Sequence, residues 1–250
     1  MTCDRVAIIT GSSRGIGAAT AKLLAHANYR VCVNFLADDV AAKSVVNALT
    51  AAGLTAIAVQ ADVSNESDVV RLFETVDEQL GTVTALVNNV GIVRPQMRVE
   101  DMDAHRINEI LRTNVTSAFL CCREAVKRMS TVHGGEGGSI VNVSSSASRI
   151  GAAGEYVDYA ASKGAIDTLT RGLSLEVAAE GIRVNCVRPG FIYTDIHAAG
   201  GEPGRVDRLA DSIPMKRGGE PIEVANSIMW LLSDEASYIT GSFIEASGGK

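Results

Sequence analysis

The stretch Thr10-Gly-Ser-Ser-Arg-Gly-Ile-Gly17 decides the fold, because this glycine-rich turn follows an apolar run and opens an amphipathic pattern. Gly11 permits a tight turn, Gly15 lets the backbone approach a pyrophosphate, and Gly17 lets a helix sit close to a sheet. The helix start offers unpaired N–H groups and a positive dipole end to phosphates. The spacing G-x-x-x-G-x-G differs from the general G-x-G-x-x-G pattern, and a plain tight loop is the alternative for the glycines alone.

Short apolar, β-branched runs alternate along the chain with stretches whose apolar residues recur three and four positions apart. The runs, apolar on both faces as in buried parallel strands, are residues 6–10, 30–35, 55–60, 85–88, 139–144, 183–187 and 242–245. The helical stretches are residues 16–27, 40–52, 66–80, about 104–130, 159–180 and 221–233. This alternation predicts an α/β fold, with a single doubly wound, Rossmann-type parallel sheet of about seven strands and helices on both faces.

The chain shows no sign of a second domain. No linker rich in proline and serine divides its 250 residues, so we expect one domain over residues 1–250. The segment 194–214 has no strong periodicity and contains Gly200, Gly201 and Gly204. Because long loops of this kind are often active-site lids, we expect residues 194–214 to form a flap.

Composition and charge argue against several classes of function. Hydrophobic residues make up 46% and charged residues 21% of the chain, as in ordinary globular proteins. The net charge is −6 and no run of lysine and arginine occurs, so we expect neither nucleic acid nor a membrane surface as a partner. No apolar run reaches the roughly 18 residues that a membrane span needs. The first ten residues do not resemble a signal peptide, and we expect none.

The cysteines and histidines indicate the compartment and the absence of metal chemistry. The five cysteines are Cys3, Cys32, Cys121, Cys122 and Cys186, an odd number without a C-x-x-C pattern. This usage favours a reducing cytoplasm over a disulfide framework. The four histidines form no H-x-x-x-H or H-E-x-x-H pattern, and no cysteine–histidine cluster has zinc spacing. We therefore expect a cytoplasmic protein without a metal site.

Four further motifs follow the glycine turn in order. They are Asn88-Asn-Val-Gly91, the helix asparagine Asn114, Tyr159-Ala-Ala-Ser-Lys163 and Pro189-Gly-Phe-Ile-Tyr-Thr194. Together with the glycine turn they resemble T-G-x-x-x-G-I-G, N-N-A-G, the helix asparagine, Y-x-x-x-K and P-G-x-I-x-T of the short-chain dehydrogenase/reductase family. The resemblance covers essentially the whole chain. It is strongest to the bacterial sugar-dehydrogenase-like and 3-oxoacyl-reductase-like members.

The resemblance implies a nicotinamide dinucleotide cofactor and a homo-oligomer, commonly a tetramer built through the two long helices and the last strand. The residues that it places at the cofactor are Gly11, Ser13, Arg14, Ile16, Asp62, Val63, Asn88, Val90, Gly91, Tyr159, Lys163, Pro189, Gly190, Ile192 and Thr194. Asp62 is expected to contact the adenine, although an aspartate at this point also fits a cap for the next turn.

Tyr159 and Lys163 are four residues apart on a predicted helix, so their side chains share one face. A free tyrosine has a pKa of about 10, which is too high for a base at neutral pH. A nearby cation favours the phenolate and lowers that pKa. With the glycine turn upstream, we expect Tyr159 to exchange a proton with an alcohol or a carbonyl, rather than form a plain surface pair with Lys163.

A serine at the end of the strand over residues 139–144 is expected to polarise the substrate oxygen. Three serines compete, and the strand pattern selects Ser145, whereas the family's usual serine-to-tyrosine spacing selects Ser146. We favour Ser145, because loops accept insertions more easily than strands do. The resemblance implies that Asn114 supports a water that links Lys163 to solvent; a solvated asparagine on the helix face is the alternative.

The end of the second strand indicates which nicotinamide cofactor is used. Enzymes that prefer NAD usually carry an acid there for the ribose 2′-hydroxyl. Here Phe35 stands at that position, so a 2′-phosphate would meet no repulsion. Arg14 in the glycine turn can pair with that phosphate, although an ordinary solvated arginine is the alternative. We therefore expect NADP(H) in preference to NAD(H).

Two departures from the family pattern affect details of the site. Val90 replaces the alanine of N-N-A-G, and its two extra carbons are expected to crowd the region beside the cofactor. Near the end of the chain, Glu245-Ala-Ser-Gly-Gly249 lacks the aspartate that commonly precedes the paired glycines. The valine at position 90 is expected to affect cofactor binding. The missing aspartate is expected to affect the conformation of the last loop.

The sequence thus predicts an NADP(H)-dependent oxidoreductase that interconverts a secondary alcohol and a carbonyl. Its small-molecule substrate is a sugar, a 3-oxoacyl compound or another small ketone or aldehyde. The catalytic residues are Asn114, Ser145, Tyr159 and Lys163. A non-catalytic NADP(H)-binding sensor or scaffold is the alternative. Substrate identity is expected to lie in residues 93–97, 149–157 and 194–214, where Arg94, Arg149 and Glu155 are either substrate contacts or solvated charges.

Overall fold

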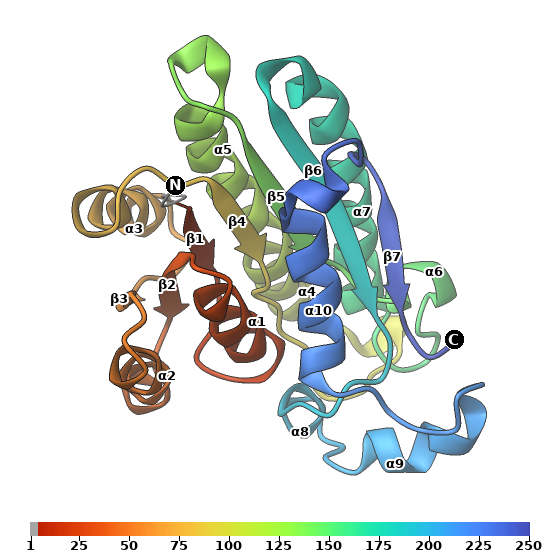
Figure 1. The fold of residues 1–250 in the computed structure, drawn as a ribbon. Helices are drawn as coiled ribbons and strands as arrows, with labels where there is room; N and C mark the ends of the chain where they lie inside the picture. Colours follow the sequence, from red (N-terminus) through yellow and green to blue (C-terminus); the bar gives the residue numbers. More distant parts are fainter. Residues whose placement is uncertain (1–4) are drawn as a thin grey trace.

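The computed structural model describes residues 5–250 and contains one seven-stranded parallel sheet (Figure 1). Its strand order is β3-β2-β1-β4-β5-β6-β7. The strands are β1 (Val6–Ile9), β2 (Arg30–Phe35), β3 (Ala56–Gln60), β4 (Ala85–Asn88), β5 (Gly138–Val143), β6 (Ile182–Pro189) and β7 (Phe243–Ala246). All neighbouring pairs are parallel, which confirms the predicted doubly wound α/β class.

Helices cover both faces of the sheet and enclose two apolar cores. The larger helices are α1 (Gly15–His26), α2 (Asp39–Ala51), α3 (Glu66–Gln79), α5 (Ser117–Met129), α7 (Val157–Val177) and α10 (Pro221–Leu232). Helices α1, α2 and α10 bury residues such as Leu24 and Ile228 against one face. Helices α3, α5 and α7 bury residues such as Phe73 and Met129 against the other. The strands are buried from both sides, which explains their continuous apolar sequence.

The predicted helical stretch over residues 104–130 is helical from residue 104 to residue 129, but it is not a regular α-helix throughout. The chain forms α4 (Ala104–Leu111), a π-helical turn η2 (Arg112–Thr116) and then α5. The widened turn contains Asn114, whose buried side chain is bonded to the backbone of Ile92 on a neighbouring loop. A π-helical turn inserts one extra residue and turns side chains away from the regular helical positions, and such turns are frequent at functional sites.

The C-terminal ends of β1, β4, β5 and β6 bring the sequence motifs to one edge of the sheet. Strands β1 and β4 are neighbours although β2 and β3 lie between them in the chain, so the strand order reverses there. Ligands of open α/β sheets bind at such a reversal. Figure 1 shows α8 (Ile196–Ala199) and α9 (Arg205–Leu209) beyond the edge to which the strand arrows point.

Cys32, Cys121, Cys122 and Cys186 are buried free thiols, whereas Cys3 lies outside the described residues. Burial raises the pKa of Cys122 to about 12 and that of Cys186 to about 12. These thiols are therefore protonated at neutral pH and behave as small apolar side chains. Among residues 5–250, no helix is both long enough and apolar enough to span a bilayer.

Candidate active site

The glycine turn, residues 10–17, takes a conformation that only glycine adopts easily. Gly11 has φ +61° and Gly15 has φ +55°, both in the left-handed region. A Cβ atom added at Gly17 would lie 2.6 Å from the carbonyl oxygen of Gly11 and 2.8 Å from the Cα atom of Ser12. Gly11 and Gly15 therefore permit the backbone of the turn, and Gly17 permits the close approach of α1 to the end of β1.

Amide side chains hold this turn in place. The Asn34 Oδ1 atom accepts a hydrogen bond from the Gly11 N–H at 3.2 Å. The Asn89 Nδ2 group donates to the carbonyl oxygens of Thr10 at 2.9 Å and Gly11 at 3.0 Å. The Thr10 hydroxyl oxygen accepts from the backbone of Asn89 and Val90. Asn34 and Asn89 were not singled out from the sequence. The feature that could have identified them is a polar residue at the end of an otherwise apolar strand.

The N-terminus of α1 fits a dinucleotide phosphate group. This helix has 12 residues, and in the described structure it has neither a side-chain cap nor an acidic residue in its first turn. Its first N–H groups and its dipole are therefore directed at the glycine turn without competition. Arg14 precedes the helix with an exposed side chain, whose Nε lies 3.8 Å from Asp195. Thr194 lies against Gly15, where a Cβ atom would come within 3.3 Å of its methyl group.

The loop after β4 joins the glycine turn to the predicted catalytic lysine. A Cβ atom at Gly11 would lie 3.0 Å from a methyl group of Val90, so the side chain of this valine lies directly beside the turn. A Cβ atom at Gly91 would lie 3.1 Å from Lys163 Nζ. Asn88 donates to Asn142 at 2.9 Å within the sheet, so its side-chain amide supports the strands.

The end of β2 presents Leu36 to solvent. Phe35 is buried in the core with 5% exposure, whereas Leu36 is 61% exposed and lines a hollow together with Asp62. Asp62 accepts hydrogen bonds from the Ser64 N–H at 2.9 Å and the Ser64 hydroxyl at 2.7 Å, so it caps the next turn. Its neighbour Val63 is buried. Phe35, which the sequence places at the acid position of NAD-preferring enzymes, thus points into the core, and the exposed side chain at the end of β2 is Leu36.

Tyr159 and Lys163 face each other on the first turns of α7, with Lys163 Nζ 5.7 Å from the centre of the tyrosine ring. The ammonium group donates to the carbonyl oxygen of Val143 at 2.8 Å. Burial lowers the pKa of Lys163 to about 8, while Cys186 and Asp167 act to raise it. Burial also raises the pKa of Tyr159, and a hydrogen bond with the side chain of Ser145 opposes that rise.

The three serines at the end of β5 have separate roles in the structure. The Ser144 hydroxyl donates to the carbonyl oxygen of Lys163 at 3.1 Å and so ties β5 to α7. The Ser145 hydroxyl oxygen accepts from the Ala147 N–H at 3.1 Å, and its side chain lies near enough to Tyr159 to lower the pKa of the phenol. The Ser146 N–H donates to the carbonyl oxygen of Pro189 at 2.9 Å. The strand count therefore selects the serine that contacts Tyr159.

Asn114 connects the π-helical turn to the site. Its Oδ1 atom accepts from the Ile92 N–H at 2.8 Å, and its Nδ2 group donates to the Ile92 carbonyl oxygen at 3.0 Å and to the Ser162 hydroxyl at 3.0 Å. A Cβ atom at Gly91 would lie 3.9 Å from Asn114 Oδ1 and 3.1 Å from Lys163 Nζ. Asn114 thus fixes the loop that passes beside the lysine.

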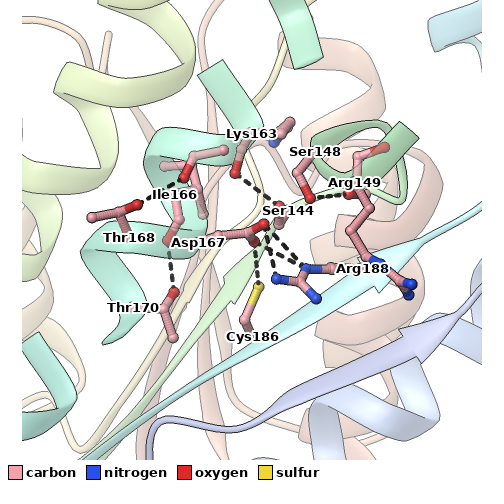
Figure 2. A network of polar contacts seen from close by, with 12 residues as sticks. Ser144, Ser148, Arg149, Lys163, Ile166, Asp167, Thr168, Thr170, Cys186 and Arg188 are labelled. Carbon is pink, nitrogen blue, oxygen red and sulfur yellow. Dashed lines mark hydrogen bonds and ion pairs between the residues drawn. The ribbon is translucent and has the colours of Figure 1, made fainter. Parts of the chain in front are cut away.

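Behind Lys163, a polar cluster joins α7 to β6, as Figure 2 shows. Asp167 lies one turn along the helix from Lys163 and accepts hydrogen bonds from Arg188 at 3.0 and 3.2 Å. The thiol of Cys186 lies 3.8 Å from the same carboxylate. The cluster fixes the helix that carries both Tyr159 and Lys163.

The Pro189 motif follows β6 and packs against the last loop. The Gly190 N–H donates to the carbonyl oxygen of Ala246 at 3.0 Å, and a Cβ atom at Gly190 would lie 2.8 Å from the Cα atom of Ser247. Ile192 is buried, and its carbonyl oxygen lies 3.0 Å from His197 Nε2 at the start of the flap. The motif thus leads from the sheet edge directly into the flap.

Ion pairs within the protein engage the loop charges that we considered as substrate contacts. Arg94 pairs with Glu109, and Arg149 pairs with Glu245 at 3.2 Å. Glu155 pairs with Arg205 of the flap. All three charges therefore have protein partners.

Glu155 belongs to residues 155–158, which we call the clamped segment. The guanidinium of Arg205 lies 5.1 Å from the ring centre of Tyr156 in this segment. The hydroxyl of Tyr156 donates to the carbonyl oxygen of Gly200 at 3.2 Å. The clamped segment therefore contacts the flap at several points and leads directly into Tyr159.

A parallel sheet of this order, with a glycine turn at the reversal of strand order, defines a dinucleotide-binding α/β protein. The comparisons with known proteins agree with this class. A family model described as enoyl-(acyl carrier protein) reductase matches residues 11–250. An Escherichia coli K12 protein, the uncharacterized oxidoreductase YgfF, is 63% identical over 245 residues, which is 98% of this chain and 99% of the relative.

A second relative carries a more specific name. The 3-oxoacyl-(acyl-carrier-protein) reductase FabG of Staphylococcus epidermidis is 35% identical over 246 residues, 98% of each chain. This chain belongs to the short-chain dehydrogenase/reductase family. It is accordingly an oxidoreductase that acts on alcohol or carbonyl groups with a nicotinamide cofactor, and the uncapped α1 and the three-glycine turn fit such a cofactor.

Proposed function

We propose that this protein is an NADP(H)-dependent oxidoreductase that interconverts a secondary alcohol and a carbonyl. The observation that carries the proposal is the meeting of Ser145, Tyr159 and Lys163 beside Gly91, the loop residue that leads back to the glycine turn. A hydroxyl, a phenol and a cation thus lie next to the predicted cofactor site. The substrate is a small molecule with a sugar, a 3-oxoacyl or another small ketone or aldehyde group.

In the proposed reaction, each of the three residues has one task. When bound, the nicotinamide cofactor supplies or accepts a hydride. Tyr159 donates a proton to the carbonyl oxygen in reduction and takes one from the hydroxyl in oxidation. Ser145 hydrogen-bonds the same oxygen and stabilises the negative charge that develops on it. Lys163, when protonated, favours the phenolate form of Tyr159 and so lowers the pKa that burial raises.

The same proposal assigns the cofactor contacts predicted above. The glycine turn and the α1 N-terminus hold the phosphates, and the residues around Gly91, Lys163 and Pro189 hold the nicotinamide half. Two features support NADP(H): the exposed Leu36 at the end of β2, which leaves no acid there to repel a 2′-phosphate, and the exposed Arg14. Arg14 would leave its 3.8 Å contact with Asp195 to pair with that phosphate.

We further propose a cytoplasmic homo-oligomer, and a tetramer by resemblance. Exposed apolar side chains support it: Leu111, Phe119 and Leu175 on α4, α5 and α7 are 40%, 52% and 74% exposed. A contact between chains through these helices would bury the three side chains. Light scattering should give four times the chain mass of 26.2 kDa; a monomer would contradict the assignment.

The experiment that tests the reaction follows absorbance of the reduced nicotinamide with NADPH and with NADH. The substrates are a panel of ketones, aldehydes and sugars together with an acetoacetyl thioester. We expect turnover with at least one carbonyl, and a kcat/KM for NADPH above that for NADH. Tight NADPH binding without turnover of any compound would support a sensor or scaffold. A higher kcat/KM for NADH would contradict the cofactor preference.

A further inference from the structure

The residue before Tyr159 is an aspartate buried in an ion pair. The Arg106 Nε group donates to Asp158 Oδ2 at 2.7 Å, and the two side chains are only 10% and 4% exposed. The other carboxylate oxygen, Asp158 Oδ1, accepts from the Tyr159 N–H at 2.9 Å. One carboxylate thus joins the arginine to the backbone of the proposed proton donor.

The same guanidinium also holds the loop that follows β4. Its Nη1 group donates to the carbonyl oxygen of Pro95 at 2.7 Å and lies 3.8 Å from the sulfur of Met97. The Met97 N–H in turn donates to the carbonyl oxygen of Glu155 at 3.0 Å. The loop of residues 93–97 and the clamped segment are therefore joined directly and through Arg106.

Arg106 itself belongs to a fixed element. It lies in α4, where its N–H is capped by the side chain of Asp103 at 2.8 Å. Helix α4 continues without a break into the π-helical turn that carries Asn114. The arginine therefore connects the helix of Asn114, the loop of residues 93–97 and the start of α7.

The energetics of the pair favour a role in geometry over a role in stability. Removing a guanidinium and a carboxylate from water is costly, and a buried ion pair is often no more stabilising than apolar side chains of similar volume. A pair whose groups also bind two separate backbone segments, as Arg106 and Asp158 do, fixes the relative position of those segments.

We propose that Arg106 and Asp158 are positioning residues that fix Tyr159 relative to the substrate loop of residues 93–97. The inference deepens the proposed function and rests on it, since it assigns Tyr159 the proton transfer. A shift of about 1 Å in a reacting group can lower a rate about 100-fold. The pair therefore sets kcat, while the cofactor phosphates are held by the glycine turn on another loop.

The test compares Arg106→Met with wild type in the presence of NADPH. We expect kcat to fall by about 100-fold while the NADPH Kd changes less than about twofold. Hydrogen exchange, followed by mass spectrometry, should accelerate in the peptides that cover residues 93–97 and 155–160 more than elsewhere. The double variant Arg106→Met with Asp158→Asn should regain part of kcat, because it removes the unpaired buried carboxylate.

Arg128→Met is the matched control. Arg128 on α5 is also largely buried, with 16% exposure, and pairs with Asp77 at 2.6 Å and Glu124 at 3.0 Å. Its loss should lower Tm without changing kcat. If Arg106→Met behaves like this control, or accelerates exchange uniformly, the inference is wrong. A wild type without turnover would contradict the proposed function instead, and the pattern of exchange would still decide the role of the pair.

Discussion

The glycine turn and the clamped segment lie at the same edge of the sheet but are held by different forces. The glycine turn is fixed by close backbone approach and by the amides of Asn34 and Asn89. The clamped segment is fixed from two sides by Arg106 and Arg205, through ion pairs to its first and last residues. The conformation of the glycine turn is therefore held by backbone packing and amide hydrogen bonds, and the position of the clamped segment is held by ion pairs.

This difference separates two functions in the account. In the proposed function, the glycine turn governs the affinity for the cofactor, whereas the clamped segment and the start of α7 govern turnover. Substitutions in the clamped segment should lower kcat and leave the cofactor Kd unchanged, whereas substitutions in the glycine turn should raise that Kd and leave kcat at saturating cofactor unchanged.

Lys163→Met should lower kcat/KM by about 1000-fold, because the cation that favours the phenolate is lost. The same change should not destabilise the protein at pH 7. A pKa lowered from 10.5 to about 8 corresponds to about 3 kcal/mol of penalty for the buried charge. Kinetics with NADPH and thermal unfolding of both proteins check these two outcomes.

The pH dependence of the stability difference between Lys163→Met and wild type has a defined sign. Between pH 8 and 10.5 the unfolded wild type binds more protons than the folded one, so wild-type stability rises with pH there. The advantage of Lys163→Met should accordingly be greatest below pH 8 and disappear toward pH 10.5. A variant that is less stable at pH 7, with a difference independent of pH, would refute a buried charged lysine.

Ser145→Ala and Ser146→Ala form a matched pair at the end of β5. We expect the first to lower kcat by about 100-fold, because it removes a donor to the substrate oxygen, and the second to change it little. The Ser145 side chain acts on the pKa of Tyr159, which places its hydroxyl beside the phenol. Steady-state kinetics at saturating NADPH measure both variants, and a larger loss in Ser146→Ala would reverse the assignment.

Gly17→Ala tests the rigidity of the glycine turn. Its Cβ atom would lie 2.6 Å from the Gly11 carbonyl oxygen, and overpacking of this kind costs about 1–3 kcal/mol. The NADPH Kd should rise about 10- to 100-fold, in line with that energy. Gly204→Ala is the control, since a Cβ atom there meets no atom within 4 Å and the residue has a negative φ. Equal Kd values in the two variants would contradict the close approach.

Leu36→Asp should have the smallest effect of the series. The new carboxylate would stand at an exposed position at the end of β2, where it repels a 2′-phosphate and accepts the ribose hydroxyl of NAD. The ratio of kcat/KM for NADPH to that for NADH should fall by about tenfold. Repulsion between the new carboxylate and the 2′-phosphate is enough to weaken NADPH binding by at least that factor. An unchanged ratio would place the 2′-phosphate elsewhere.

The same contrast explains how much could be predicted from the sequence. The seven strands, most helices and the glycine turn could be predicted, because they depend on the periodicity of apolar residues and on glycines within a few positions of one another. The π-helical turn at Asn114 could not be predicted, because the partner of its asparagine is Ile92, 22 residues away. The Arg106–Asp158 pair spans 52 residues, and an isolated arginine in a helical pattern looks like an ordinary surface residue.

The most direct test of the account is Tyr159→Phe, with kcat/KM and the NADPH Kd measured on the same preparation. The change removes only the phenolic oxygen, whose pKa the Ser145 side chain lowers, and leaves the ring beside Lys163. The account predicts a loss of kcat/KM of about 1000-fold, the range of general acid catalysis, with the Kd unchanged within about twofold. A kcat/KM within about threefold of wild type would contradict the assignment of Tyr159 as the proton donor.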